Sequence, residues 1–201
     1  MGRKSEARKK IIDTARELFW KNGYGATGVA QILSHAGIGS GSFYWFFKSK
    51  EDLLVAVLEQ YLELLDSMIA APAFKKSTDP IERIFLILEG YRQILEEYDF
   101  QLGCPIGNIA LELGDKYENV REMTIKNFEN WRNMIKKCLH DASNSFPPNT
   151  DFDAMTVFIL TTMEGAMMQA RAHKDISYFD DSIVQLRVYF NSLLTKKEFD
   201  S

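Results

Sequence analysis

The chain has 201 residues, of which 46% are hydrophobic and 26% charged, and its formal net charge at pH 7 is −4. This length accommodates one large or two small domains with a hydrophobic core, and the composition is that of an ordinary globular protein. Two cysteines, Cys104 and Cys138, are too few for a disulfide scaffold, and their spacing fits no zinc site. We therefore expect a reducing compartment, with no metal and no cofactor.

Membrane and export signals are weak. The first residues are polar and charged, which argues against a signal peptide. The longest apolar run, MTVFILTTMEGAMM, is interrupted by Glu164 and is shorter than the ~20 residues that a membrane span requires. These features predict a cytoplasmic protein without a membrane partner.

Charge is divided unevenly along the chain. Residues 1–50 contain nine Lys or Arg against three Asp or Glu, a net charge of +6, which leaves −10 for the remainder. A basic segment on an acidic body is expected when only that segment meets a polyanion. A solvated basic tail is the alternative, but it does not account for Lys48 and Lys50.

Helical periodicity dominates the sequence and predicts an all-α protein of about nine helices. Gly23 should end the first helix, Thr27 should cap the second, and Ser49 and Asp79 should cap two later ones. The segment APAFKKSTDP should interrupt the helices. In chain order, the predicted helices cover residues 6–22, 27–36, 40–47, 49–70, 80–98, 106–113, a stretch ending near 142, 151–173 and 180–194. We expect a small basic N-terminal domain at 1–50 and a larger acidic bundle at 51–201.

Residues 28–47 combine two short helices with the tight turn AGIG between them. This is the helix-turn-helix arrangement, in which the second helix enters the DNA major groove. The stretch GSGS at its start is small, which lets backbone and hydroxyl groups approach phosphates and bases. Phe43 and Phe47 share a face and should pack inside, whereas Tyr44 and Trp45 point elsewhere. We expect the phenol to donate to a phosphate and the indole to meet the DNA backbone or a thymine methyl.

The segment at residues 7–61 resembles the DNA-binding domain of the TetR family of transcriptional regulators. The matching elements are A-x-x-L-F at 15–19, G-Y-x-A-T at 23–27, A-G-I at 36–38, F-Y-W-F-F at 43–47 and K-S-K-E-D-L at 48–53. Several spaced elements in the same order make this a specific signal.

The resemblance implies which residues meet DNA. Thr27, Ser42, Tyr44 and Lys50 would contact phosphates, and Ser40, Ser42 and Trp45 would lie nearest the bases. The full set of expected DNA-binding residues is Thr27, Gly39, Ser40, Gly41, Ser42, Tyr44, Trp45, Lys48 and Lys50. Gly39 and Ser40 stand where members of the family commonly have Ser and then Lys, and Trp45 stands where they often have His. The operator sequence therefore cannot be predicted from the operators of relatives.

The helix predicted at 151–173 is apolar nearly all round, which a helix packed on one side only would not be. The resemblance implies that the last two helices form a four-helix homodimer interface. We expect contributions from Phe158, Thr162, Gly165, Ala166, Gln169, Ile183, Leu186 and Phe190. A twofold dimer places its recognition helices ~34–36 Å apart and predicts a palindromic operator.

The resemblance also implies an effector cavity in the middle helices, because Met and aromatic residues suit an adaptable apolar pocket. The expected lining residues are Phe85, Leu88, Tyr91, Phe100, Ile109, Phe128, Trp131, Met163 and Met167, with Arg92 and Glu164 as polar contacts. For each of them singly, ordinary core packing is the commoner role. A small, largely apolar effector would release DNA by favouring another dimer geometry.

We expect no enzyme, because the three histidines are far apart and no phosphate-binding glycine motif follows a strand. The sequence favours a ligand-responsive regulator, and a repressor over an activator. Two alternatives stay open. One is a thiol-responsive regulator that senses through Cys104, and the other is a helical interaction protein that does not bind DNA.

Overall fold

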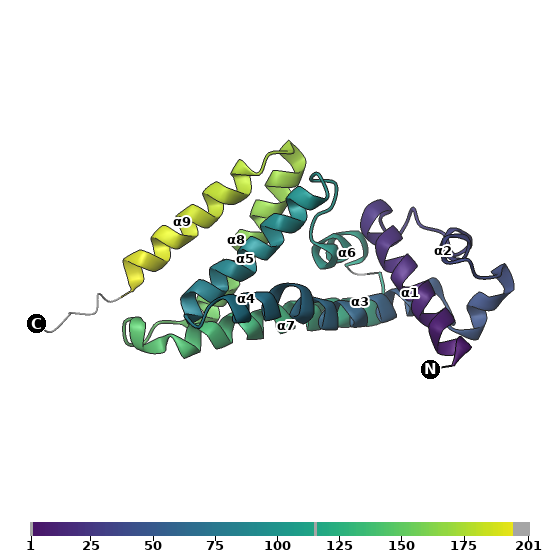
Figure 1. Ribbon diagram of the computed structural model, residues 1–201, viewed down its shortest axis with the longest axis horizontal. Helices are drawn as coiled ribbons and strands as arrows, with labels where there is room; N and C mark the ends of the chain where they lie inside the picture. Colours follow the sequence, from purple (N-terminus) through teal and green to yellow (C-terminus); the bar gives the residue numbers. More distant parts are fainter. Residues whose placement is uncertain (1, 115, 195–201) are drawn as a thin grey trace, which may run out of the picture. The chain divides into compact units, whose positions relative to one another are not determined.

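The computed structural model describes residues 2–114 and 116–194, and these residues contain helices and loops but no strand (Figure 1). The all-α prediction is confirmed. The α-helices are α1 (Arg3–Asn22), α2 (Val29–Ala36), α3 (Lys50–Leu65), α4 (Ala71–Lys76), α5 (Pro80–Glu97), α6 (Pro105–Leu113), α7 (Glu118–Asp141), α8 (Phe152–His173) and α9 (Ser177–Leu193). Two 3₁₀ segments, η1 (Ser40–Trp45) and η3 (Ser143–Ser145), and the π-helical turn η2 (Asp66–Ala70) complete them.

Two predicted helix caps, Asp79 and Ser49, are confirmed, and Asp151 is a third cap that was not predicted. The Asp79 carboxylate accepts from the backbone N–H groups of Ile81 and Glu82 ahead of α5, and the Asp151 carboxylate accepts from Ala154 ahead of α8. The Ser49 hydroxyl accepts from the N–H of Asp52 at the start of α3. Such side chains satisfy N–H groups that have no partner within the helix.

Three local predictions were wrong. The N-cap of α2 is Gly28, not Thr27. The α-helix predicted at 40–47 is replaced by the shorter 3₁₀ segment η1, Ser40–Trp45, consistent with the glycines at its start. The break at 71–80 is shorter than predicted, because helical structure continues through η2 and α4 as far as Lys76. Pro72 lies in the first turn of α4, where a missing N–H costs little.

The described residues form two compact units. Unit 1 comprises the chain up to Leu64 together with Pro105–Phe128, and unit 2 comprises Leu65–Cys104 and the residues from Glu129 onward. This division differs from the predicted boundary after residue 50, because α6 and the first part of α7 pack with the N-terminal helices. Asn127 of α7, for example, donates to the carbonyl of Leu58 in α3 at 3.0 Å.

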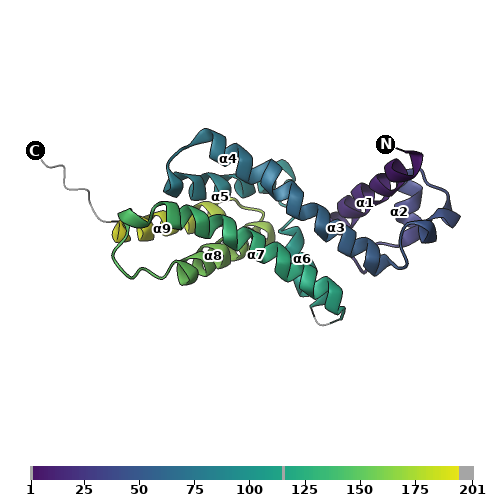
Figure 2. The same cartoon turned by 90° about the horizontal axis from the view of Figure 1, so that it is seen from below.

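In unit 1, α1 and α2 lie side by side in both views (Figure 1, Figure 2). Phe43 and Phe47 are buried with their ring centroids 5.7 Å apart, which confirms that they share an inward face. In unit 2, α8 and α9 form a helical hairpin that also contacts α5. Trp131, Phe179 and Phe190 are fully buried there. Among the described residues, every helix is too short or too polar to span a lipid bilayer.

Candidate DNA-binding surface

The segment η1 presents two large aromatic side chains to solvent. Tyr44 is 78% exposed and Trp45 is 76% exposed, whereas the preceding Phe43 is 1% exposed. The Tyr44 ring stands edge-on to Phe43 at 5.4 Å, so the buried ring supports the exposed one. Two adjacent exposed rings bring no packing benefit to an isolated chain, and such groups are characteristic of binding surfaces.

The expected DNA-binding residues of the reading segment (residues 39–48) lie on this surface. Gly39, Ser40, Gly41 and Lys48 are exposed, and Ser42 is half-buried. A Cβ atom at Gly41 would meet nothing within 4 Å, and one at Gly39 would meet only the Ser42 hydroxyl at 3.9 Å. The protein's own packing therefore does not require these glycines, whereas the close approach of an external partner would.

Thr27 and Lys50 occupy a different environment from the one expected. Thr27 is completely buried, and its hydroxyl donates to the carbonyls of Gly23 at 2.7 Å and Leu18 at 3.2 Å. The expectation that the Thr27 side chain contacts phosphate needs correction, because this hydroxyl closes the end of α1. We assign Thr27 a structural role in the turn between α1 and α2.

The Lys50 ammonium donates to two carbonyls of that turn, 2.8 Å from Tyr24 O and 2.9 Å from Thr27 O. It also lies 4.0 Å from the centroid of the Tyr24 ring. Partial burial lowers the pKa of Lys50, and the nearby Lys116 adds to this effect while Glu112 opposes it. The expected phosphate contact of Lys50 is therefore replaced by a contact within the protein.

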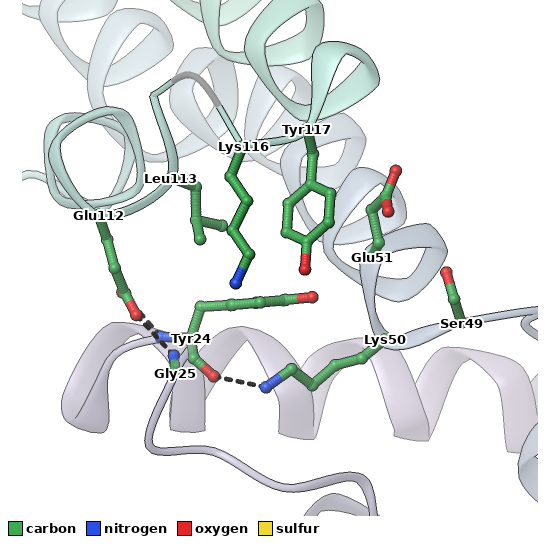
Figure 3. Close-up of a pocket in the computed structure, with 9 residues that line it drawn as sticks. All are labelled: Tyr24, Gly25, Ser49, Lys50, Glu51, Glu112, Leu113, Lys116 and Tyr117. Atoms are coloured by element: carbon green, nitrogen blue, oxygen red, sulfur yellow. Dashed lines mark hydrogen bonds between the residues drawn. The ribbon is translucent and has the colours of Figure 1, made fainter.

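Glu112 is a further residue of this region, and its role was not apparent from the sequence. Its carboxylate, presented by α6, accepts from the N–H of Tyr24 at 2.9 Å and of Gly25 at 2.6 Å (Figure 3). These groups line a pocket of about 520 Å³ together with Lys50, Lys116 and Tyr117. No local pattern could have identified Glu112, because it is 88 residues from Tyr24 in the sequence.

Most of the residues expected to line an effector pocket are in unit 2. Tyr91, Leu88, Trp131, Met163 and Met167 are buried. The Tyr91 and Trp131 rings lie 5.6 Å apart. Phe85 is also buried, with its ring 5.4 Å from that of Phe190, and Phe100 is half-buried. Ile109 and Phe128, by contrast, belong to unit 1.

Arg92, expected as a polar effector contact, is committed to ion pairs. Its Nε donates to Asp180 Oδ1 at 2.7 Å, its Nη2 donates to Asp180 Oδ2 at 3.0 Å, and its Nη1 donates to Glu96 at 2.7 Å. The hydrogen bond to Asp180 raises the pKa of Arg92 further. The bidentate pair joins α5 to α9, so the expectation for Arg92 needs correction.

Glu164, the other expected polar contact, lies in a buried polar cluster with Tyr91 and Cys104. Burial raises the pKa of Glu164, and a hydrogen bond with Cys104 opposes the rise. Burial also raises the pKa of Tyr91, with Cys104 and Glu164 adding to the rise. Glu164 Oε1 is buried without a hydrogen-bond partner among the described residues. Cys104 itself is 4% exposed.

The predicted dimer residues divide into two groups. Ala166, Leu186 and Phe190 are at most 3% exposed within the single chain, so they are core residues and the expectation for them needs correction. Phe158 and Gln169 are exposed, and Thr162, Gly165 and Ile183 are half-buried. A Cβ atom at Gly165 would meet nothing within 4 Å.

Helices α8 and α9 expose several apolar side chains. Five of them, here called the α8/α9 face, are Val157, Phe158, Met168, Val184 and Val188, and α9 also exposes the charged Asp181 and Arg187. On α8, the exposed or half-buried positions between 154 and 170 carry Ala, Val, Phe, Leu, Thr, Glu, Gly, Met and Gln, and the one acid, Glu164, belongs to the buried cluster. Such a face is typical of a contact with another apolar surface.

Two family models match the chain. The model described as "Bacterial regulatory proteins, tetR family" matches residues 11–57, and the model described as "Tetracyclin repressor-like, C-terminal domain" matches residues 80–186. The first contains the turn and the reading segment, and the second contains α5 to α8 and most of α9.

Individual relatives extend over nearly the whole chain. The HTH-type transcriptional repressor DhaR of Mycobacterium sp. (strain GP1) is 27% identical over 97% of this chain and 96% of its own length. The HTH-type transcriptional regulator YxaF of Bacillus subtilis (strain 168), whose function is uncharacterized, is 28% identical over 87% and 90%. The crystal structure of a TetR transcriptional regulator from Chloroflexus aurantiacus superposes with a TM-score of 0.86 at 27% identity, covering 96% of this chain and 98% of that one.

Proposed function

Because the chain belongs to the TetR family of transcriptional regulators, we propose that it binds a palindromic DNA operator as a homodimer and is released by a small, largely apolar effector. The reading segment carries the DNA-binding part of this proposal. Trp45 and the open backbone at Gly39 and Gly41 meet bases, while Tyr44 and Lys48 contact phosphates. The observation on which this depends is the exposure of Tyr44 and Trp45, 78% and 76%, on a supported 3₁₀ segment.

The α8/α9 face supports the homodimer. Its members are exposed and apolar, and a Cβ atom at Gly165 of α8 would meet nothing within 4 Å, which leaves room for a second helix to approach closely. Pairing two such faces around a twofold axis would present two reading segments to the successive half-sites of a palindrome. Phe158, Thr162, Gly165, Gln169 and Ile183 stay in the proposed interface.

The effector part of the proposal depends on the buried residues of unit 2. Tyr91, Trp131, Met163 and Met167 are buried there, and we propose that they line the effector site, because aromatic and Met side chains suit an adaptable apolar pocket. The unpartnered Glu164 Oε1 supplies one acceptor, so we propose an effector with an apolar body and a single N–H or O–H donor. Binding would shift the dimer toward a geometry that does not fit the operator.

The relative DhaR is a transcriptional repressor, and we propose repression as the mode of action here too, exerted on DNA in the cytoplasm. A thiol-responsive regulator is disfavoured by the burial of Cys104. If Cys104→Ser abolished release by an effector that still binds, that alternative would replace the proposal.

Selection of bound fragments from random and genomic DNA tests the proposal. We expect palindromic fragments, retained with steep salt dependence, and a protein mass of two chains in sedimentation. Compounds that carry an apolar body and one donor should then release the best fragment. Failure to retain any duplex at low salt, or a mass of one chain, would disprove it.

A further inference from the structure

The turn between α1 and α2 is held by side chains from two other helices of unit 1. Glu112 of α6 accepts from the N–H groups of Tyr24 and Gly25, and Lys50 of α3 donates to the carbonyls of Tyr24 and Thr27. Figure 3 shows the two side chains reaching Tyr24 and Gly25 from different helices. Four backbone polar groups of one turn are thus satisfied by a carboxylate and an ammonium rather than by a regular helix.

The backbone of the turn is shaped to receive this carboxylate. A Cβ atom at Gly25 would lie 3.0 Å from Glu112 Oε1, and one at Gly23 would lie 3.2 Å from Glu112 Oε2. Gly23 also has a φ of +84°, which residues with a side chain rarely adopt. Two glycines therefore leave space for the Glu112 side chain, and adjacent N–H groups give charge-assisted hydrogen bonds to it.

We propose that Glu112 is a positioning residue for DNA binding, whose carboxylate holds the Tyr24–Gly25 turn and thereby the orientation of α2 and the reading segment. This inference rests on the proposed function. The turn leads directly into α2, whose N-cap is Gly28, and α2 packs against η1. When Glu112 is withdrawn, two N–H groups lose their acceptor and the turn has to be ordered again at the DNA surface.

Because Glu112 is negatively charged, a charge effect and a positioning effect predict opposite changes in DNA affinity when it is replaced. Removing an acid from a DNA-binding unit strengthens binding to a polyanion if charge alone matters. If Glu112 instead positions the Tyr24–Gly25 turn, its removal weakens DNA binding. We therefore compare Glu112→Ala and Glu112→Gln with Glu122→Ala, which removes an exposed carboxylate of α7 in the same unit. The dissociation constant is measured against the best selected fragment at fixed salt.

We expect about tenfold weaker binding for both Glu112 variants, with an unchanged salt dependence, and unchanged or slightly tighter binding for Glu122→Ala. Amide hydrogen exchange should accelerate at Tyr24 and Gly25 in the Glu112 variants only. Glu112→Asp, which keeps the charge but is one methylene shorter, should resemble Glu112→Gln and serves if Glu112→Ala does not fold.

Glu112 variants that bind DNA as tightly as the unaltered protein, or that leave exchange at Tyr24 and Gly25 unchanged, would overturn the inference. Its failure is distinguishable from that of the proposed function. If the unaltered protein bound no duplex DNA at all, the regulator proposal would fail, whereas the exchange experiment would still report on the turn.

Discussion

The Lys50 ammonium lies 2.8 Å from the carbonyl oxygen of Tyr24 and 4.0 Å from the centroid of the Tyr24 ring. One side chain of α3 therefore contacts both the backbone and the aromatic face of a single residue in the turn. This geometry separates Lys50 from Lys48, two residues earlier, whose side chain is exposed. Two lysines of the same motif should thus affect DNA binding for different reasons.

Replacing Lys50 with Met should lower the free energy of unfolding by about 1–2 kcal/mol, because two carbonyls of the turn lose their donor. Binding should weaken for every DNA sequence while the salt dependence stays the same. Lys48→Ala is the matched control. It should leave stability within about 0.5 kcal/mol and reduce the salt slope by about one phosphate contact. Urea unfolding and binding titrations at several salt concentrations measure both quantities.

Replacing Trp45 with Ala should change which DNA sequences are bound without changing stability, because the side chain is 76% exposed. Loss of a base contact typically costs about 1–3 kcal/mol of discrimination at one position. Fragment selection with the variant measures the altered preference. An equal loss of affinity for all fragments would instead assign Trp45 to the phosphate contacts. Tyr44→Phe should give that uniform loss, about fivefold, because it removes one hydroxyl donor.

If the chain dimerises through the α8/α9 face as proposed, replacing Val157 with Asp should give single chains, because the change places a charge in that apolar surface. Val157 is 52% exposed in the single chain, so folding itself should be preserved. Met68→Asp is the control, since Met68 is 63% exposed in unit 2 but outside the α8/α9 face. Sedimentation equilibrium reports the mass. A dimeric Val157→Asp protein would place the interface elsewhere.

The dependence of stability on pH should change when Glu164 is replaced with Gln. Burial raises the pKa of this carboxyl above its ordinary value of 4.5 in the folded protein. Between the unfolded and the folded pKa the folded protein binds more protons, so this group makes stability fall as pH rises through that window. Glu164→Gln removes the contribution and keeps an acceptor for Cys104. The variant should be more stable than the unaltered protein at pH 7–8, and the difference should shrink toward pH 4.5. Urea unfolding across this pH range measures it.

On α8 and α9, the sequence alone could not separate core residues from interface residues. Both helices were expected to pack on more than one side, because α8 is apolar nearly all round. Periodicity gives no information on which side meets the protein's own core, since both sides carry the same residue types. The expected set therefore mixed Leu186 and Phe190, which are buried in the chain, with exposed Phe158.

The sequence by itself determined most of the helical elements, the caps at Ser49 and Asp79, and the inward pair Phe43 and Phe47 beside the outward Tyr44 and Trp45. These features depend on residues within a few positions of one another, where spacing and side-chain chemistry decide the outcome. Only the tertiary structure decided the roles of Thr27, Lys50 and Glu112. Their hydrogen bonds join segments up to 88 residues apart, and which partners meet is a property of how the helices pack, not of any local pattern.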